Sequence, residues 1–201
     1  MKSLSKLQEL IIKYSSNSIK YKSLDSLILD NTVKIITPSV KVKRNEYSST
    51  GLTPIISQEI EYISGYCDIV DSSIEKDEYI CFGDHSEHIK FVDFAFVQGA
   101  DGLKILSVKD KNLLLPKYLY YSLLDNYIRR NNYERHFKYL RDTSIPIPPI
   151  EIQEEVVKIL DKFTELQKEL NAELQARIKE YEWYRHTLLS FNNWLGGEKV
   201  E

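Results

Sequence analysis

The stretch IPIPPIEIQEEVVKILDKF, Ile145 to Phe163, joins two kinds of sequence that fold differently. Pro146, Pro148 and Pro149 cannot continue a helix, and each favours extended backbone in the residue before it. From Glu151 to Phe191 the chain contains neither proline nor glycine. The stretch therefore predicts a rigid, extended joint that leads directly into one long helix.

Apolar residues recur along this predicted helix at alternating spacings of four and three, which is the pattern of a coiled-coil seam; two later spacings of four resemble a stutter. A helix of forty residues is about 60 Å long. Because the chain offers no second long helix to cover the seam, we expect another copy of the chain to do so. The alternative is a helix folded back over its own sheet. The predicted dimer interface consists of Ile152, Val156, Ile159, Phe163, Leu166, Leu170, Leu174 and Ile178.

The sequence before the joint is dominated by short runs rich in Val, Ile, Tyr and Phe, which turn residues separate. The predicted strands are TVKIIT (32–37), SVKVKR (39–44), LTPIIS (52–57), EYISGYCDIV (61–70), EYICFG (78–83), HIKFVDFAFV (88–97) and KILSV (104–108). Pro116 opens a helical pattern that ends near Asn131 and Asn132, and a short second segment, HFKYLRDTS, follows. The predicted fold class is α+β. A mostly antiparallel, β-rich globular domain (1–148) precedes the long helix (149–191) and a short tail (192–201).

Composition indicates an ordinary globular protein, because 42% of the 201 residues are hydrophobic and 28% are charged. The net charge of −3 is uneven. Residues 1–150 hold 20 Lys and Arg against 19 Asp and Glu, whereas residues 151–201 hold 7 against 11. A nearly neutral body would bind DNA through local basic patches. The chain has no apolar run of about 18 residues and no signal-peptide core, so we expect a soluble, cytoplasmic protein without membrane contact.

Motifs of catalysis are missing from the sequence. It contains no GxGxxG, P-loop, HExxH or GxSxG pattern. Cys67 and Cys81 lie 14 residues apart, which does not fit the close pairs of a structural zinc site with His85 and His88, so small buried side chains are the better interpretation. Acidic residues between Asp68 and Glu78 fall in a turn-rich stretch and indicate a solvated surface. We therefore expect no enzyme activity, cofactor or metal in this chain.

Two segments carry signals of DNA binding: the polar loop from Lys41 to Gln58 and the basic segment from Arg129 to Arg141. Lys and Arg bind phosphates, while Arg, Asn and Gln read base edges. The alternative is ordinary solvated charge. His85 could stand at the groove or cap a turn. The candidate DNA-binding residues are Lys41, Lys43, Arg44, Ser48, Ser49, Thr50, Gln58, Tyr62, His85, Arg129, Arg130, Tyr133, Arg135, Lys138 and Arg141.

The joint and the end of the helix resemble the conserved region of type I restriction–modification specificity subunits. That region has two prolines, a glutamine a few residues later and a Val/Ile-rich segment ending in Leu-Asp, and here Pro148-Pro149, Gln153 and Val156–Asp161 match it. The closing motif Tyr-x-x-Tyr-Arg-x-x-Leu-Leu-x-Phe matches Tyr181 to Phe191. Upstream, PIISQ (54–58), GYCD (65–68) and FGDHSEHIKFVDFAFVQGADGLKIL (82–106) resemble the family's target recognition domain.

The resemblance implies a non-catalytic subunit whose target recognition domain reads half of a bipartite DNA site. Its helix acts as a spacer and docks modification subunits, which bind S-adenosylmethionine and methylate adenine; restriction subunits can join the complex. Full-length members carry two recognition domains and two helical regions, and this sequence has one of each. Two copies that pair their helices would then read a palindromic split site. The alternatives are a silent or truncated specificity cassette, a coiled-coil module that binds protein, and a stand-alone nuclease.

Overall fold

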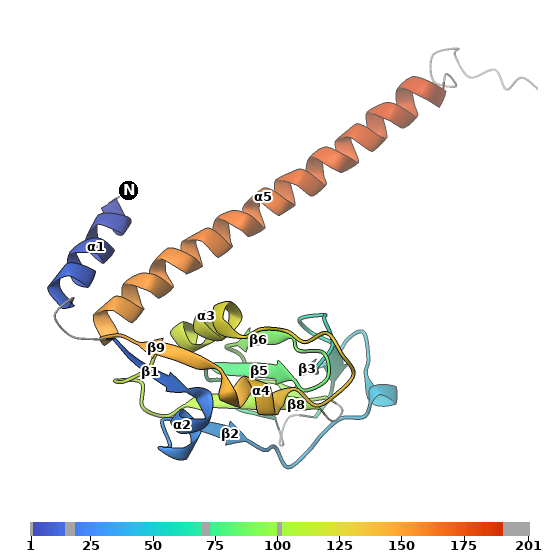
Figure 1. Ribbon diagram of the computed structural model, residues 1–201. Coiled ribbons are helices and arrows are strands. Elements are labelled where there is room, and N and C mark those ends of the chain that lie inside the picture. The colour runs from blue at the N-terminus through green and yellow to red at the C-terminus, as the bar shows by residue number, and fades with distance from the viewer. Residues whose placement is uncertain (1, 15–18, 70–72, 100–101, 191–201) are drawn as a thin grey trace, which may run out of the picture. The chain divides into compact units, whose positions relative to one another are not determined.

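The computed structural model describes residues 2–14, 19–69, 73–99 and 102–190 (Figure 1). The chain forms two compact units, Met1–Val157 and Lys158–Glu201. The first unit holds the described strands, and the second holds most of one helix. In the described part of the chain, no helix is both long and apolar enough to cross a bilayer. The α+β fold class, a β-rich domain followed by a long helix, is confirmed.

A four-stranded antiparallel sheet lies at the centre of the first unit. Its order is β2 (Val33–Ile36), β8 (Leu103–Val108), β5 (Tyr79–Gly83) and β6 (Ile89–Val92). Successive side chains of a strand point to opposite faces. Ile80 and Phe82 accordingly join one buried cluster, and Tyr79 and Cys81 join another. Both faces of the sheet are therefore covered.

Three short helices supply the first cluster: α2 (Leu24–Leu29), α3 (Pro116–Asn126) and α4 (Phe137–Asp142) (Figure 1). Pro116 opens α3, where a missing N–H costs nothing. Leu119 and Leu123, one helical turn apart, are buried with Ile80 and Phe82 of the sheet. This packing fixes both ends of the segment that links α3 to α4.

The second cluster includes Ile56 from a three-stranded sheet of order β4 (Gly65–Cys67), β3 (Thr53–Ile56) and β7 (Val97–Gln98). The β3–β4 pair is antiparallel, and the β3–β7 pair is parallel. Cys67 and Cys81 are free and buried, as predicted for small core side chains. Burial raises the pKa of the Cys81 thiol to about 12.

The joint consists of β9 (Ser144–Ile147), which pairs antiparallel with β1 (Lys20–Ser23), and the first turns of α5 (Ile150–Ser190). Gln153 is fully buried, and its side chain makes three hydrogen bonds. Its Oε1 accepts the Leu115 N–H at 2.9 Å, and its Nε2 donates to the carbonyls of Leu113 at 2.9 Å and Pro148 at 2.8 Å. The Gln153 side-chain amide, at the start of α5, thus bonds to the proline joint and to the segment just before α3.

Near the amino terminus lies α1 (Lys2–Tyr14). The Lys6 ammonium forms an ion pair with the buried Glu155 carboxylate at 3.2 Å. In the second unit, α5 is exposed along most of its length from Lys158 to Ser190. Arg177 pairs there with Glu180 at 2.9 Å and Glu173 at 4.0 Å. The helix predicted for 149–191 spans 41 residues, Ile150–Ser190.

Four details of the predicted secondary structure are wrong. The run HIKFVDFAFV (88–97) is divided between β6 and β7, which belong to different sheets. The run SVKVKR contains only an isolated bridge at Lys41, after which the 3₁₀ helix η1 (Arg44–Glu46) begins. The strand predicted for 61–70 is reduced to Gly65–Cys67. The helix that begins at Pro116 ends at Asn126, because Tyr127 is extended and the following amides bind a distant carboxylate.

Candidate nucleic-acid interface

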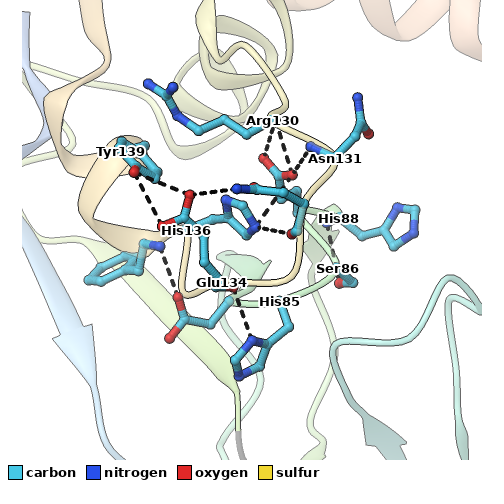
Figure 2. Close-up of polar contacts among 12 residues, drawn as sticks. His85, Ser86, His88, Arg130, Asn131, Glu134, His136 and Tyr139 are labelled. Carbon is cyan, nitrogen blue, oxygen red and sulfur yellow. Dashed lines mark hydrogen bonds and ion pairs between the residues drawn. The ribbon is translucent and has the colours of Figure 1, made fainter.

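The segment between α3 and α4, residues 127–136, forms a basic loop whose backbone donates hydrogen bonds to a buried carboxylate (Figure 2). Glu87, in the turn between β5 and β6, is 2% exposed. Its carboxylate accepts hydrogen bonds from the Arg130 N–H at 2.9 Å, the Asn131 N–H at 2.8 Å and the Tyr127 hydroxyl at 2.5 Å. Charge-assisted bonds of this kind contribute about 1.5–3 kcal/mol each. The loop's backbone is therefore held against the turn.

Burial of Glu87 would by itself raise the pKa of its carboxyl group. The hydrogen bonds from Tyr127, Arg130 and Asn131, together with the nearby His136, outweigh burial and lower that pKa below its ordinary 4.5. The carboxyl group of Glu87, which anchors the loop, is therefore ionised at neutral pH. Glu87 also has a φ of 57°, in the left-handed region that residues other than glycine rarely occupy.

His136 closes the other end of the loop from a fully buried position. Its Nε2 donates to the Asn132 carbonyl at 2.8 Å and lies 3.6 Å from the nearer Glu87 oxygen. Its backbone N–H donates to the Asp84 carbonyl at 2.8 Å. The residues between these contacts are thereby presented as a defined surface loop.

Beside the loop lies a pocket of about 380 Å³ lined by Lys41, Asp84, His85, Gly102, Leu103, Lys104 and Arg135. Its three cationic side chains come from positions far apart in the sequence. Asp84 is buried; its Oδ1 accepts the Phe137 N–H at 2.8 Å, and its Oδ2 lies 3.9 Å from the Lys104 Nζ. The cations outnumber the one carboxylate, so the pocket is electropositive.

An aromatic pair that includes the pocket residue His85 stands at the edge of this pocket. The His85 ring stacks on Tyr133, with centroids 5.4 Å apart and planes 15° from parallel. His85 Nδ1 lies 3.0 Å from the Glu134 carbonyl, which can only accept, so Nδ1 carries the proton. Tyr133 is 93% exposed. An exposed flat ring beside a cationic pocket suits contact with a base or a sugar.

The structure brings four predicted DNA-binding residues together: Lys41, His85 and Arg135 line the pocket, and Tyr133 stacks beside it. The other cations of the basic segment have partners within the protein. Arg130 lies over the Tyr139 ring at 3.7 Å, and Arg129 contacts the His88 Nδ1 at 3.4 Å. Lys138 pairs with Glu134 at 3.1 Å, and the Arg141 Nε donates to Asp25 at 2.6 Å.

The candidate residues in and near the polar loop also fall into two groups, exposed side chains and side chains with partners in the protein. Ser48, Ser49, Thr50 and Lys43 are exposed, and Arg44 pairs with Glu59 at 3.1 Å. Gln58 accepts the His85 N–H at 3.2 Å. The Tyr62 hydroxyl donates to the Phe91 carbonyl at 2.5 Å, and burial raises the pKa of Tyr62 to about 12. Contacts of this loop with DNA stay a prediction.

The predicted dimer seam falls into two parts. Ile152 is buried, and Val156 packs against the main core, both within the first unit. Ile159 is half-buried. The remaining five side chains are exposed: Phe163, Leu166, Leu170, Leu174 and Ile178. Among the described residues, no cluster of three His, Cys, Asp or Glu side chains is arranged to hold a metal ion.

Comparison with known proteins gives this geometry a context. The family model for the type I restriction modification DNA specificity domain matches residues 33–180. The chain belongs to this family. The match includes the basic loop, the residues that line the pocket and most of α5.

Among curated specificity subunits, that of the EcoR124I/EcoR124II type I restriction enzyme of Escherichia coli is 35% identical over 162 residues. This alignment covers 75% of the chain and 40% of the subunit. A putative type I specificity subunit of Mycoplasma pneumoniae is 30% identical over 106 residues, which are 48% of the chain and 34% of that protein. The chain therefore spans less than half the length of these specificity subunits.

Solved structures support the specificity-domain fold. The type I restriction–modification S subunit of M. genitalium aligns with a TM-score of 0.59 and 17% identity, over 88% of this chain and 47% of that one. A structure that concerns complex assembly and conformational transition of a type I system gives a TM-score of 0.53 and 17% identity, over 90% and 51%. At this identity the likeness concerns the fold.

Sequence reasoning missed three residues of this specificity domain's site: Glu87, Asp84 and Lys104. Lys104 lies in the predicted strand KILSV, where a lysine reads as a solvent-facing position. Its position near the start of β8, opposite Phe82 of β5, takes it to the pocket. In the sequence, nothing indicates the role of Glu87 except that it is an acidic residue between two histidines, His85 and His88, in a predicted turn.

Proposed function

We propose that this chain determines DNA sequence specificity in a type I restriction–modification system. The observation that carries the proposal is the convergence of Lys41, Lys104 and Arg135 on one pocket beside the exposed Tyr133 ring, in a chain of the specificity family. Cations fix the register of a protein on DNA, and side chains around them read bases. The first unit would read one half of a bipartite site.

The chain's role in this proposal is non-catalytic. Methylation of adenine belongs to modification subunits that bind S-adenosylmethionine and dock on the specificity subunit, and a restriction subunit joins the same complex. Membership of the specificity family supports this division of labour.

Two copies of the chain complete the proposal. Five apolar side chains, from Phe163 to Ile178, are exposed along one helix in the second unit. Removing such a stripe from water contributes about 25 cal/mol per Å² of apolar surface. Pairing with the same helix of a second copy would cover it, and two-fold symmetry would make the recognised sequence a palindrome with a spacer.

Sedimentation of the purified chain, alone and with the methyltransferase subunit, tests the assembly. We expect a dimer of twice 23.6 kDa that takes up methyltransferase. Mapping methylated adenines after co-expression then tests the specificity, and a split palindrome is the expected result. A monomer that ignores the methyltransferase and binds no DNA would contradict the proposal and favour a silent cassette or a protein-binding module.

A further inference from the structure

We propose that the pocket lined by Lys41, Lys104, Arg135 and His85 is a phosphate subsite that holds one phosphodiester of the DNA backbone. The inference rests on the proposed function, since it takes DNA as the ligand of the first unit. The inference names the cations that would hold the DNA backbone. It distinguishes them from the other exposed cations of the first unit.

The charge of the pocket suits a single oxyanion. Lys41, Lys104 and Arg135 contribute three positive charges, and Asp84 contributes one negative charge. The Asp84 carboxylate is directed into the fold, where its Oδ1 accepts the Phe137 N–H. It therefore holds the loop in place, and the net charge of the lining side chains is positive.

Lys104 and Arg135 differ from neighbouring cations in that their side chains have N–H groups available to a ligand. Within the described ranges Arg135 forms no ion pair and no side-chain hydrogen bond, and the nearest carboxylate oxygen to Lys104 is 3.9 Å away, beyond hydrogen-bonding distance. Arg44, Lys138 and Arg141 each lie within 3.1 Å of a carboxylate oxygen. A guanidinium with free N–H groups can bind two phosphate oxygens at once.

His85 lines the pocket from the turn between β5 and β6. Because Nδ1–H is committed to the Glu134 carbonyl, Nε2 is the nitrogen left for a ligand. The same hydrogen bond ties the ring to the loop that carries Tyr133 and Arg135.

The dimensions agree with a phosphodiester. A cavity of about 380 Å³ corresponds to roughly a dozen water molecules, enough for a phosphate group and part of its sugar. Tyr133, stacked on His85 at the rim, extends the contact to the adjoining nucleotide. Since Glu87 and His136 fix the loop that carries Tyr133 and Arg135, the subsite requires little ordering on binding.

The test measures affinity for duplex DNA as a function of salt concentration. The Lys104→Gln/Arg135→Gln double variant should bind every sequence about tenfold more weakly, and the slope of log affinity against log salt should fall by about one, which corresponds to one phosphate. Lys109→Gln is the matched control. It makes the same substitution on an exposed lysine just past β8, about 16 Å along the strand from Lys104, and should leave the slope unchanged.

Arg135→Gln alone provides a second variant, because Arg135 is exposed and its loss leaves the core intact, whereas Lys104 neighbours the buried Asp84. An unchanged slope in both variants would overturn the subsite and leave the proposed function standing. Weaker binding to some sequences only would also overturn it, because those cations would then read bases.

A wild-type chain that binds no DNA would contradict the proposed function instead. The pocket is then tested by titration with inorganic phosphate, followed by NMR signals of His85 and Tyr133. Shifts that Arg135→Gln abolishes support an oxyanion site. No shifts would overturn the inference as well.

Discussion

The first two turns of α5 and the turns beyond Lys158 share one apolar spacing and differ in what covers it. Ile152 is 6% exposed, and the buried side chain of Gln153 makes three hydrogen bonds. Leu170, on the same stripe of the same helix, is 65% exposed. An apolar stripe therefore indicates that a helix needs a partner, and the partner can change along its length. Here the rest of the first unit covers the first turns of α5, and we propose that a second copy of the chain covers the later turns.

Leu170→Asp attacks the exposed part of the seam and should have the largest effect. A charge placed in a paired seam costs about 3–5 kcal/mol, so the dimer dissociation constant should rise more than a hundredfold. Sedimentation equilibrium measures this change. Asn171→Asp, one residue along and off the seam, introduces the same side chain and should leave dimerisation intact. Unchanged association of the Leu170 variant would contradict helix pairing.

Gln153→Ala attacks the buried part and should act on the fold of each chain. It leaves the Leu115 N–H and the carbonyls of Leu113 and Pro148 without their partner, so the free energy of unfolding should fall by about 3 kcal/mol. Urea denaturation provides the measurement. The exposed neighbour gives the control, Glu154→Ala, which should cost little. Equal stabilities of the two variants would refute the role given to the amide.

Lowering the pH should destabilise the first unit and have less effect on the second, and this difference should be smaller than the effects above. The pKa of Glu87 is lower in the folded protein than its ordinary 4.5, so its contribution to stability is present above pH 4.5 and is lost as the pH falls through the folded value. In the described part of the second unit, Lys158–Ser190, no carboxylate is buried.

Denaturation curves recorded from pH 7 to pH 3 should therefore show that wild type and Glu87→Gln converge below pH 4.5. The variant should be the less stable protein at neutral pH. A constant difference between the two proteins across this range would contradict the ionised anchor.

Arg177→Ala should have the smallest effect. Its ion pairs with Glu173 and Glu180 are exposed on the helix surface, where such pairs contribute a few tenths of a kcal/mol. Thermal melting followed by circular dichroism should shift little, and added salt should remove what difference there is. A shift as large as that of Gln153→Ala would mean that Arg177 has a partner outside its own helix.

Local pattern predicted the fold where strands are regular and buried. Val33–Ile36, Tyr79–Gly83 and Leu103–Val108 are runs of β-branched and aromatic residues, which pleated surfaces favour. The strand KYKS, Lys20–Ser23, has no such composition. It is a strand because β9 pairs with it from more than 120 residues away. No window of sequence contains that cause.

The candidate site was predictable as a region and not as a set of groups. Charge and aromatic composition indicated the segment Arg129–Arg141, which contains the basic loop. Which cations remain available depends on partners chosen in three dimensions: Arg141 pairs with Asp25, 116 residues away. Arg135 has no such partner among the described residues and meets Lys104 at the pocket. The sequence alone cannot distinguish these two arginines.

The burial of both native cysteines makes the chain suited to site-specific chemistry. The thiolate is the form that attacks thiol reagents, and burial that raises the pKa of Cys81 to about 12 suppresses that form while also blocking access. A cysteine introduced at Leu174, which is exposed on the seam, would be the reactive thiol of the described chain. A spectroscopic label attached there would report the distance between two copies directly, without a change to either native cysteine.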